Sequence, residues 1–156
     1  MTWFKENFPE KKIRKRIIIL LIILILAIAF YLNMPKDTVM LKANNCLFKV
    51  ELATNSMEHY KGLSNRDFLC SDCGMLFLFD RKQNLNFVMR EMNFPLDIIF
   101  IADRKILNIH ENLEPEGKNP ENLYSSLGKA DAVLEINANK ARACNLKPGD
   151  IITWSQ

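Results

Sequence analysis

Glycine and histidine are scarce in this chain of 156 residues, which has five glycines and two histidines. No glycine-rich pattern of the Walker or dinucleotide-binding type is present, which argues against nucleotide chemistry. The two imidazoles, His59 and His110, are too few for a histidine-rich metal site. His110 does not open an HExxH motif, because Glu114 stands where the second histidine belongs. We therefore expect no metal site and no other cofactor.

The chain also lacks a charge excess outside its N-terminal segment. Its formal net charge is +3, but residues 1–16 hold six basic and two acidic groups, which leaves 15 basic and 16 acidic groups in residues 33–156. The excess cations directly precede an apolar run and form no patch on a globular domain, so we expect no nucleic-acid partner. With 49% hydrophobic and 25% charged residues, the composition fits one folded domain and does not fit disorder, collagen or coiled coil.

Residues 17–32 contain no charge, and Asn33 and Met34 continue the uncharged stretch. A helix of this length reaches about 27 Å, close to the roughly 30 Å thickness of a hydrocarbon core. The basic segment 1–16 predicts a cytoplasmic N-terminus by the positive-inside rule. We expect residues 17–34 to form a single-pass transmembrane helix, a signal anchor or uncleaved signal. It would attach a periplasmic or extracellular C-terminal domain to the cell membrane.

A cleaved secretory signal is the alternative for this segment. Residues 27–29 (AIA) form a small-x-small site, and cleavage near Ala29 would release a secreted protein. Residues 30–32 (FYL) continue the apolar run past that site, and Tyr31 suits an interfacial position, which favours the anchor. A buried globular helix fits poorly, because the run has no polar face.

Alternating apolar residues predict strands in the rest of the chain. In segment 46–52, Phe48 and Val50 fall on one face while Lys49 and Glu51 fall on the other. Further strands are expected at 38–42, 75–79, 86–90, 96–102, 105–111, 132–136 and 151–154. Two short helices are expected near 55–63 and 137–144, and residues 112–131 are expected to form one long surface loop. The prediction is a mainly β fold, a folded-over sheet forming a sandwich or pseudo-barrel of about eight strands.

The predicted organisation therefore has four parts. Residues 1–16 form a basic cytoplasmic segment and residues 17–34 the membrane helix. Residues 35–45 supply a linker and the first strand, and residues 46–156 form the β domain. The linker is short, so we expect the domain to lie close to the membrane.

Four cysteines permit three disulfide connectivities. In an oxidising compartment, the pairs Cys70–Cys73 and Cys46–Cys144 are the simplest choice. The Cys70 and Cys73 spacing also allows a redox disulfide or half of a metal site. A thioredoxin-like site would need a βαβ unit, and a zinc ribbon would need a second close pair; the sequence shows neither. Cys46 can instead be a buried thiol on an apolar strand face.

Asp97 opens the apolar segment 96–102 and is its only charge. A buried carboxylate needs a partner, which we expect to be Arg90 or the amides of a turn. A functional alternative places several side chains around one concave opening, closed by the long loop. The candidate residues are Arg90, Asp97, His110, Tyr124, Ser125 and Glu135.

The order of several segments resembles a known family. The segments are VELATNSMEHYKGLSNR (50–66), GMLFLF (74–79), FVMREMNFPLDIIFI (87–101), YSS (124–126), AVLEINA (132–138) and LKPGDIITW (146–154). They are similar to the prokaryotic family called domain of unknown function 192, over residues 46–154. The resemblance implies a small, mostly β domain and no assigned activity. Glu91 replaces a frequent amide, Arg104-Lys105 replaces a frequent Asp-Gly turn, and Cys70 and Cys73 are additions to the pattern.

These observations lead to three functional hypotheses. We expect a membrane-anchored, exported domain that acts as a binding or accessory module at the cell envelope. Its partners would be the membrane, through the N-terminal helix, and an unknown envelope ligand or protein. The alternative is a small envelope hydrolase that acts on glycan or ester substrates through Asp97 and Glu135, with His110 in support. A thiol redox role would need an exposed Cys70 with a lowered pKa.

Overall fold

The computed structural model describes residues 10–32 and 37–155. The chain divides into two compact units, Met1–Pro35 and Lys36–Gln156. In the described residues, the first unit contains one helix, and the second contains a β sheet with two short helices. Each unit is described separately below.

The first unit contains helix α1, Glu10–Leu32, which begins before the apolar run and includes its basic flank. The side chains of residues 13–28 are all exposed, with no buried face. Within the part of the chain that the structure covers, no helix meets the length and apolarity needed to cross a membrane. Asn33 and Met34, the last residues of the predicted transmembrane segment, lie outside the described residues. The structure therefore supports a helix here and leaves its transmembrane role a prediction.

The second unit contains one sheet, which in the described residues has seven strands. The strands are β1 (Thr38–Ala43), β2 (Cys46–Ala53), β3 (Cys73–Phe87), β4 (Leu96–Ala102), β5 (Lys105–Leu113), β6 (Tyr124–Asn137) and β7 (Ile152–Trp154). Their order across the sheet is β5-β4-β6-β3-β2-β1-β7. Strands β2 and β3 are parallel, and all other neighbours are antiparallel.

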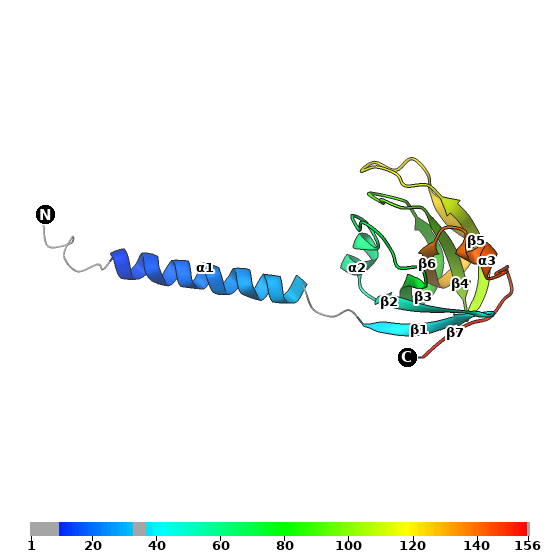
Figure 1. The fold of residues 1–156 in the computed structure, drawn as a ribbon, viewed down its shortest axis with the longest axis horizontal. Coiled ribbons are helices and arrows are strands. Elements are labelled where there is room, and N and C mark those ends of the chain that lie inside the picture. The colour runs from blue at the N-terminus through cyan, green and yellow to red at the C-terminus, as the bar shows by residue number, and fades with distance from the viewer. Residues whose placement is uncertain (1–9, 33–36, 156) are drawn as a thin grey trace, which may run out of the picture. The chain divides into compact units, whose positions relative to one another are not determined.

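The sheet curls until its two edges meet. Lys105 on β5 forms an isolated bridge with Ile151, and the amide of Ile152 donates to the carbonyl of Arg104 at 2.8 Å. Figure 1 shows this curl in the second unit, where β7 lies beside β1 and α3 lies beside β5. The folded-over, mainly β architecture predicted from the sequence is confirmed.

The predicted strand count and loop length need correction. Segments 75–79 and 86–90 are not two strands, because β3 runs continuously to Phe87 and bends where its pairing register shifts between Leu78 and Gln83. The predicted loop 112–131 is also shorter. Strand β5 continues to Leu113, which pairs with Leu96 on β4. Strand β6 begins at Tyr124, because the polar ends of β3 and β6 pair with each other and satisfy their backbone groups.

Helix α2, Ser56–Lys61, begins with a capping box. The Asn55 side chain accepts from the amide of Glu58 at 3.0 Å, and the Glu58 carboxylate accepts from the amides of Thr54 and Asn55. The bond from Thr54 is the main reason why the pKa of Glu58 is lowered. The helix ends at Gly62, whose φ of 47° suits a residue without a Cβ. A short helix α3, Lys140–Ala143, follows β6.

The apolar core occupies both faces of the sheet. Alternate residues of β4 join two different clusters: Ile99 and Ile101 face one side, while Ile98 and Phe100 face the other. Strand β4 is thus covered on both faces, as its apolar sequence predicts. The second cluster continues toward α2, and the candidate site lies on that side.

Candidate functional site

A pocket of about 270 Å³ opens between α2 and the sheet. Its walls combine aromatic and aliphatic side chains with a few polar groups. The main lining residues are His59, Tyr60, Lys61, Gly62, Leu63, Phe77, Phe79, Leu85, Phe87, Arg90, Met92 and Glu135. Of the six candidates from the sequence, the pocket brings together Arg90 and Glu135.

Glu135 on β6 supplies a buried carboxyl to the pocket. Its exposed fraction is 6%, and no hydrogen bond or ion pair involves this side chain among residues 10–32 and 37–155. A Cβ built on Gly62 would lie 3.9 Å from Glu135 Oε2, so the absent side chain at Gly62 leaves space beside the carboxyl. Burial raises the pKa of Glu135 to about 8, against a smaller opposing effect of the positive charge on Arg66. The carboxyl is therefore protonated at neutral pH.

Arg90 lies on another part of the pocket wall. Its guanidinium carbon is 4.0 Å from the centre of the Tyr60 ring, and its Nη2 donates to the Tyr60 carbonyl at 2.6 Å. The Arg90 backbone is held by Ser64 Oγ, which donates to its carbonyl at 2.8 Å. In the described part of the chain, no carboxylate forms an ion pair with Arg90. The pocket therefore presents an uncompensated cation in a fixed position.

Aromatic rings form the apolar wall of the pocket. The rings of Phe77 and Phe87 meet edge to face with centroids 5.0 Å apart, and the His59 ring lies 4.4 Å from that of Phe79. His59 Nε2 is also 3.0 Å from the carbonyl oxygen of Ala53, which fixes the imidazole at the rim. These contacts restrict the side chains that a ligand would touch.

Asp97 does not belong to this pocket. Its Oδ1 accepts from the amides of Asn112 at 2.8 Å and Asn139 at 3.1 Å, and its Oδ2 accepts from the amide of Ala141 at 2.8 Å. The side chain is fully buried, and these backbone donors satisfy it. The structure thus favours turn amides over an ion pair with Arg90. The structure therefore does not bring all six candidates together around this pocket.

His110, Tyr124 and Ser125 form a separate cluster. His110 Nε2 lies 3.0 Å from the Ser125 carbonyl oxygen, and the His110 and Tyr124 rings are 5.5 Å apart. Ser125 Oγ donates to Asn86 Oδ1 at 2.7 Å. Burial raises the pKa of Tyr124, and the nearby charge of Glu116 raises it further. None of the three lines the pocket, although Phe100 lies between Phe87 of the pocket wall and His110.

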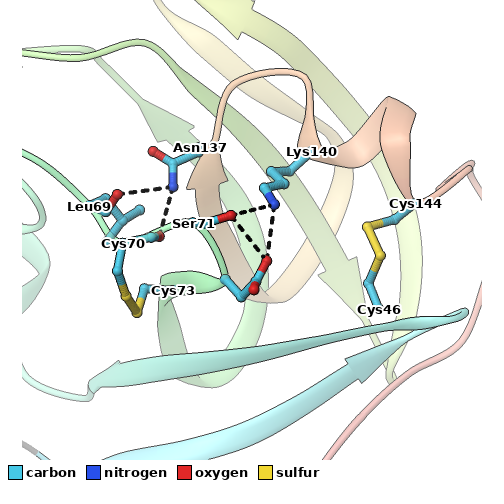
Figure 2. Close-up of polar contacts among 9 residues, drawn as sticks. Cys46, Leu69, Cys70, Ser71, Cys73, Asn137, Lys140 and Cys144 are labelled. Carbon is cyan, nitrogen blue, oxygen red and sulfur yellow. Dashed lines mark hydrogen bonds and ion pairs between the residues drawn. A yellow bond between two sulfur atoms is a disulfide. The ribbon is translucent and has the colours of Figure 1, made fainter.

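All four cysteines are paired. Cys46 of β2 is joined to Cys144 after α3, and Cys70 is joined to Cys73 at the start of β3 (Figure 2). The Cys70–Cys73 pair leads into a strand and not into a helix, which does not resemble a thioredoxin-like site. Across the residues that the structure describes, no group of three His, Cys, Asp or Glu side chains is placed to hold a metal ion.

Polar contacts hold the loop of the short disulfide in place. Lys140 Nζ donates to Ser71 Oγ at 2.9 Å and to Asp72 Oδ1 at 3.0 Å, and Asn137 Nδ2 donates to the Cys70 carbonyl at 2.9 Å (Figure 2). The hydrogen bond and charge of Lys140 lower the pKa of Asp72. The loop is thereby attached to the end of β6, which fits a structural disulfide.

The comparisons with known proteins agree with this fold. A family model, DUF192, described as "Uncharacterized ACR, COG1430", matches residues 39–154. The chain belongs to this family. Its DUF192 domain is similar to a crystal structure from Sinorhizobium meliloti 1021, described as that of a proposed transcription regulator. The two chains are 32% identical, with a TM-score of 0.69, and the match covers 77% of this chain and 94% of the other.

A second DUF192 neighbour is a protein of unknown function from Novosphingobium aromaticivorans DSM 12444. It is 37% identical with a TM-score of 0.68, and the match covers 76% of this chain and 85% of that one. No curated protein matches the chain. The sequence resemblance is therefore confirmed at the level of family and fold.

Sequence reasoning missed much of the pocket in this DUF192 domain. Phe77, Phe79, Phe87 and Tyr60 are not among the six candidates from the sequence, yet all four line the pocket. The available signal was Glu135 itself, a lone carboxyl within the apolar segment 132–136, which has the same pattern as Asp97. That pattern marks a buried carboxyl but does not show which face of the sheet it occupies.

Proposed function

We propose that the DUF192 domain of this chain is a small-molecule binding module whose site is the Glu135 pocket. The observation that carries the proposal is the buried carboxyl of Glu135, which lines an open pocket and has no hydrogen-bond partner in the described residues. Buried polar groups are nearly always hydrogen-bonded, so we expect this carboxyl to bind a polar group that enters the pocket, which is water in the free protein and a ligand in the complex. Small-molecule sites typically combine an apolar wall with a few polar groups, as this pocket does.

Methyl NMR of the full chain in phospholipid nanodiscs tests this proposal. The probes are benzoate, benzamide and benzamidine, which share one shape and differ in charge. Binding in the pocket predicts shifts of the Leu63, Leu85 and Met92 methyl signals and none at Leu41 or Ile152 on the opposite face. If none of the three probes shifts the pocket methyls, the proposed site is wrong.

Variants of two neighbouring residues sharpen this test. Phe79 lines the pocket, whereas Leu78, the preceding residue on β3, packs against the other core cluster. Phe79→Ala should weaken probe binding because it removes part of the aromatic wall. Leu78→Ala should not, because its side chain faces away from the pocket. Equal effects of both variants would argue against binding in the pocket.

We further propose that α1 holds the domain at a membrane. Residues 17–28 are apolar and exposed on every side of the helix, and water is a poor solvent for such a surface. The basic residues in segment 11–16 favour a position beside anionic lipid head groups on the cytoplasmic side.

The proposed location of the DUF192 domain is outside the cytosol, at the cell envelope. Two disulfides support an oxidising compartment. A reporter that is active only outside the cytosol, fused after the last residue, should be active with the full chain. Activity only of a cytosolic reporter would contradict this location, and release of the domain without α1 would favour signal cleavage near Ala29 instead.

Two other functions have less support. A hydrolase that uses a pair of carboxylates is not favoured, because Asp97 lies outside the Glu135 pocket. The description of the Sinorhizobium relative raises DNA binding. Residues 33–156 of this chain have 15 basic and 16 acidic groups, which gives little attraction for phosphates. We therefore retain the expectation of an envelope ligand and no nucleic-acid partner.

A further inference from the structure

We infer that the Glu135 pocket takes a small organic carboxylate, held by the Glu135 carboxyl and the Arg90 guanidinium. This inference rests on the proposed function, because it names the ligand class of the same site. It follows from four properties of the pocket: the unpaired carboxyl, its protonation state, the cations around it and the size of the cavity.

The first property is the missing partner of Glu135. A buried polar group is stabilised by a hydrogen bond. The side chain is only 6% exposed, and no described residue forms a hydrogen bond with its carboxyl group. A polar ligand atom in the pocket can supply this hydrogen bond in place of water. The site therefore favours a ligand with at least one polar group directed at β6.

The second property is the protonation state of this carboxyl. Since burial raises its pKa to about 8, Glu135 carries a proton at neutral pH and can donate one hydrogen bond. The strongest acceptor for such a donor is an ionised carboxylate, which forms short charge-assisted bonds. A ligand ammonium group could donate to the remaining acceptor oxygen of this carboxyl, but the charges of Lys61 and Arg90 on the pocket wall would repel it.

The third property is the positive charge around the carboxyl. Lys61 and Arg90 line the pocket, and Arg66 acts on Glu135 from nearby while forming an ion pair with Glu51. His59 and Tyr60 are the other titratable side chains that α2 contributes to the lining. Glu135 is the only carboxyl among the lining residues described, so the surrounding charges attract an anion and repel a cation.

The fourth property is the size and wall of the cavity. About 270 Å³ lies slightly below the range of roughly 300–1,000 Å³ typical of sites for drug-sized ligands, so the pocket suits about ten non-hydrogen atoms. The wall of Phe77, Phe79 and Phe87 favours an apolar or aromatic body. A ligand with one carboxylate and one apolar or aromatic group would contact both the polar groups and the aromatic wall of the pocket.

Calorimetric titration of the full chain in nanodiscs, with empty nanodiscs as the blank, tests the inference. The same three probes are used: benzoate, benzamide and benzamidine. Benzoate should bind most tightly at pH 7. Its affinity should fall about tenfold between pH 7 and pH 9, because Glu135 loses the donated proton. Benzamide should show no comparable loss, since it carries no charge to be repelled.

Two variants with matched controls test the two groups. Arg90→Met should weaken benzoate about tenfold and leave benzamide nearly unchanged. Arg104→Met is the control, because Arg104 stacks on Trp154 in the same way outside the pocket. Glu135→Gln keeps a donor at every pH, so benzoate affinity should lose its pH dependence. Glu121→Gln is the control, because Glu121 is exposed in a loop, and this variant should retain the pH dependence of benzoate affinity.

The outcomes separate this inference from the proposed function. Tighter binding of benzamide or benzamidine, with shifts at the pocket methyls, would overturn the carboxylate class and leave the pocket as the binding site. Benzoate binding whose pH dependence survives Glu135→Gln would overturn the role of Glu135. If no probe shifts the pocket methyls, the proposed function and the ligand class both fail.

Discussion

Asp97 on β4 and Glu135 on β6 lie on adjacent strands, and their side chains point to opposite faces of the sheet. The register pairs Asp97 with Ile136 and Ile98 with Glu135. Paired residues share a face and successive residues alternate, so the two carboxyls are separated by the sheet itself. One binds backbone amides, and the other lines a pocket. The two therefore have different roles, and each can be tested alone.

Asp97→Asn should lower the free energy of unfolding by about 3 kcal/mol, because the new amide directs a donor at backbone N–H groups and removes charge-assisted bonds. Urea unfolding of the full chain in detergent micelles, followed by tryptophan fluorescence, measures the loss. The control is Asp131→Asn, because Asp131 accepts only one amide, that of Asp103 at 3.2 Å. A loss no larger than that of Asp131→Asn would show that Asp97 is not a structural anchor.

Glu135→Gln should stabilise the fold in a pH-dependent manner. The folded-state pKa of Glu135 is about 8, above its ordinary value of 4.5. Between these values the unfolded chain releases a proton that the folded chain retains, so wild-type stability falls as pH rises and levels off above the folded pKa. The variant should therefore match the wild type near pH 4 and exceed it by roughly 5 kcal/mol near pH 9.

Urea midpoints of both proteins across this pH range measure the difference. Glu121→Gln is the control, because Glu121 is exposed in the loop between β5 and β6. A wild-type protein whose stability relative to Glu135→Gln does not change with pH would contradict burial of an unpaired carboxyl.

The two disulfides should contribute unequally to stability. Cys46–Cys144 spans 98 positions and Cys70–Cys73 spans three, and a longer closed loop restricts the unfolded chain more. Replacing the long-range pair with serines should cost about 4–5 kcal/mol, and replacing the short pair about 2 kcal/mol. Thermal unfolding of the two double variants compares them. A larger loss from the short pair would show that its loop has a role beyond chain entropy.

Helix α1 should bind the full chain to phospholipid vesicles. Leu21→Lys together with Ile25→Lys places two charges in its apolar segment, at a cost of about 2.5–3.5 kcal/mol each in a bilayer centre. We expect the wild type to float with vesicles in a density gradient and the double variant to remain at the bottom. The matched control is Leu123→Lys with Leu127→Lys, two exposed leucines of the DUF192 domain. Equal flotation of both variants would contradict the proposed anchor.

Local sequence patterns predict the elements of this domain well. The apolar segment 96–102 forms β4, an interior strand of the sheet, and Asn55 with Glu58 forms the capping box. These features depend on residues close in sequence. The continuity of β3 through residues 80–85 was not predictable in this way, because those polar residues are held in a strand by distant partners on β6.

The candidate site was predictable only in part. A lone carboxyl in an apolar strand correctly marked Asp97 as buried, and Glu135, which has the same pattern, is buried as well. Their faces depend on the β4 and β6 register, and the donors to Asp97 come from Asn112, Asn139 and Ala141, which only the fold brings together. Long-range pairing therefore decides which carboxyl can meet a ligand.

Titration of the Glu135 side chain tests the account most directly. Carbon-13 NMR of the carboxyl carbon, in the full chain in nanodiscs, reports its protonation at each pH. We predict a midpoint near 8 without ligand and a higher midpoint with saturating benzoate, because benzoate binds the protonated form. A midpoint near the ordinary value of 4.5, or one that benzoate leaves unchanged, would contradict the account.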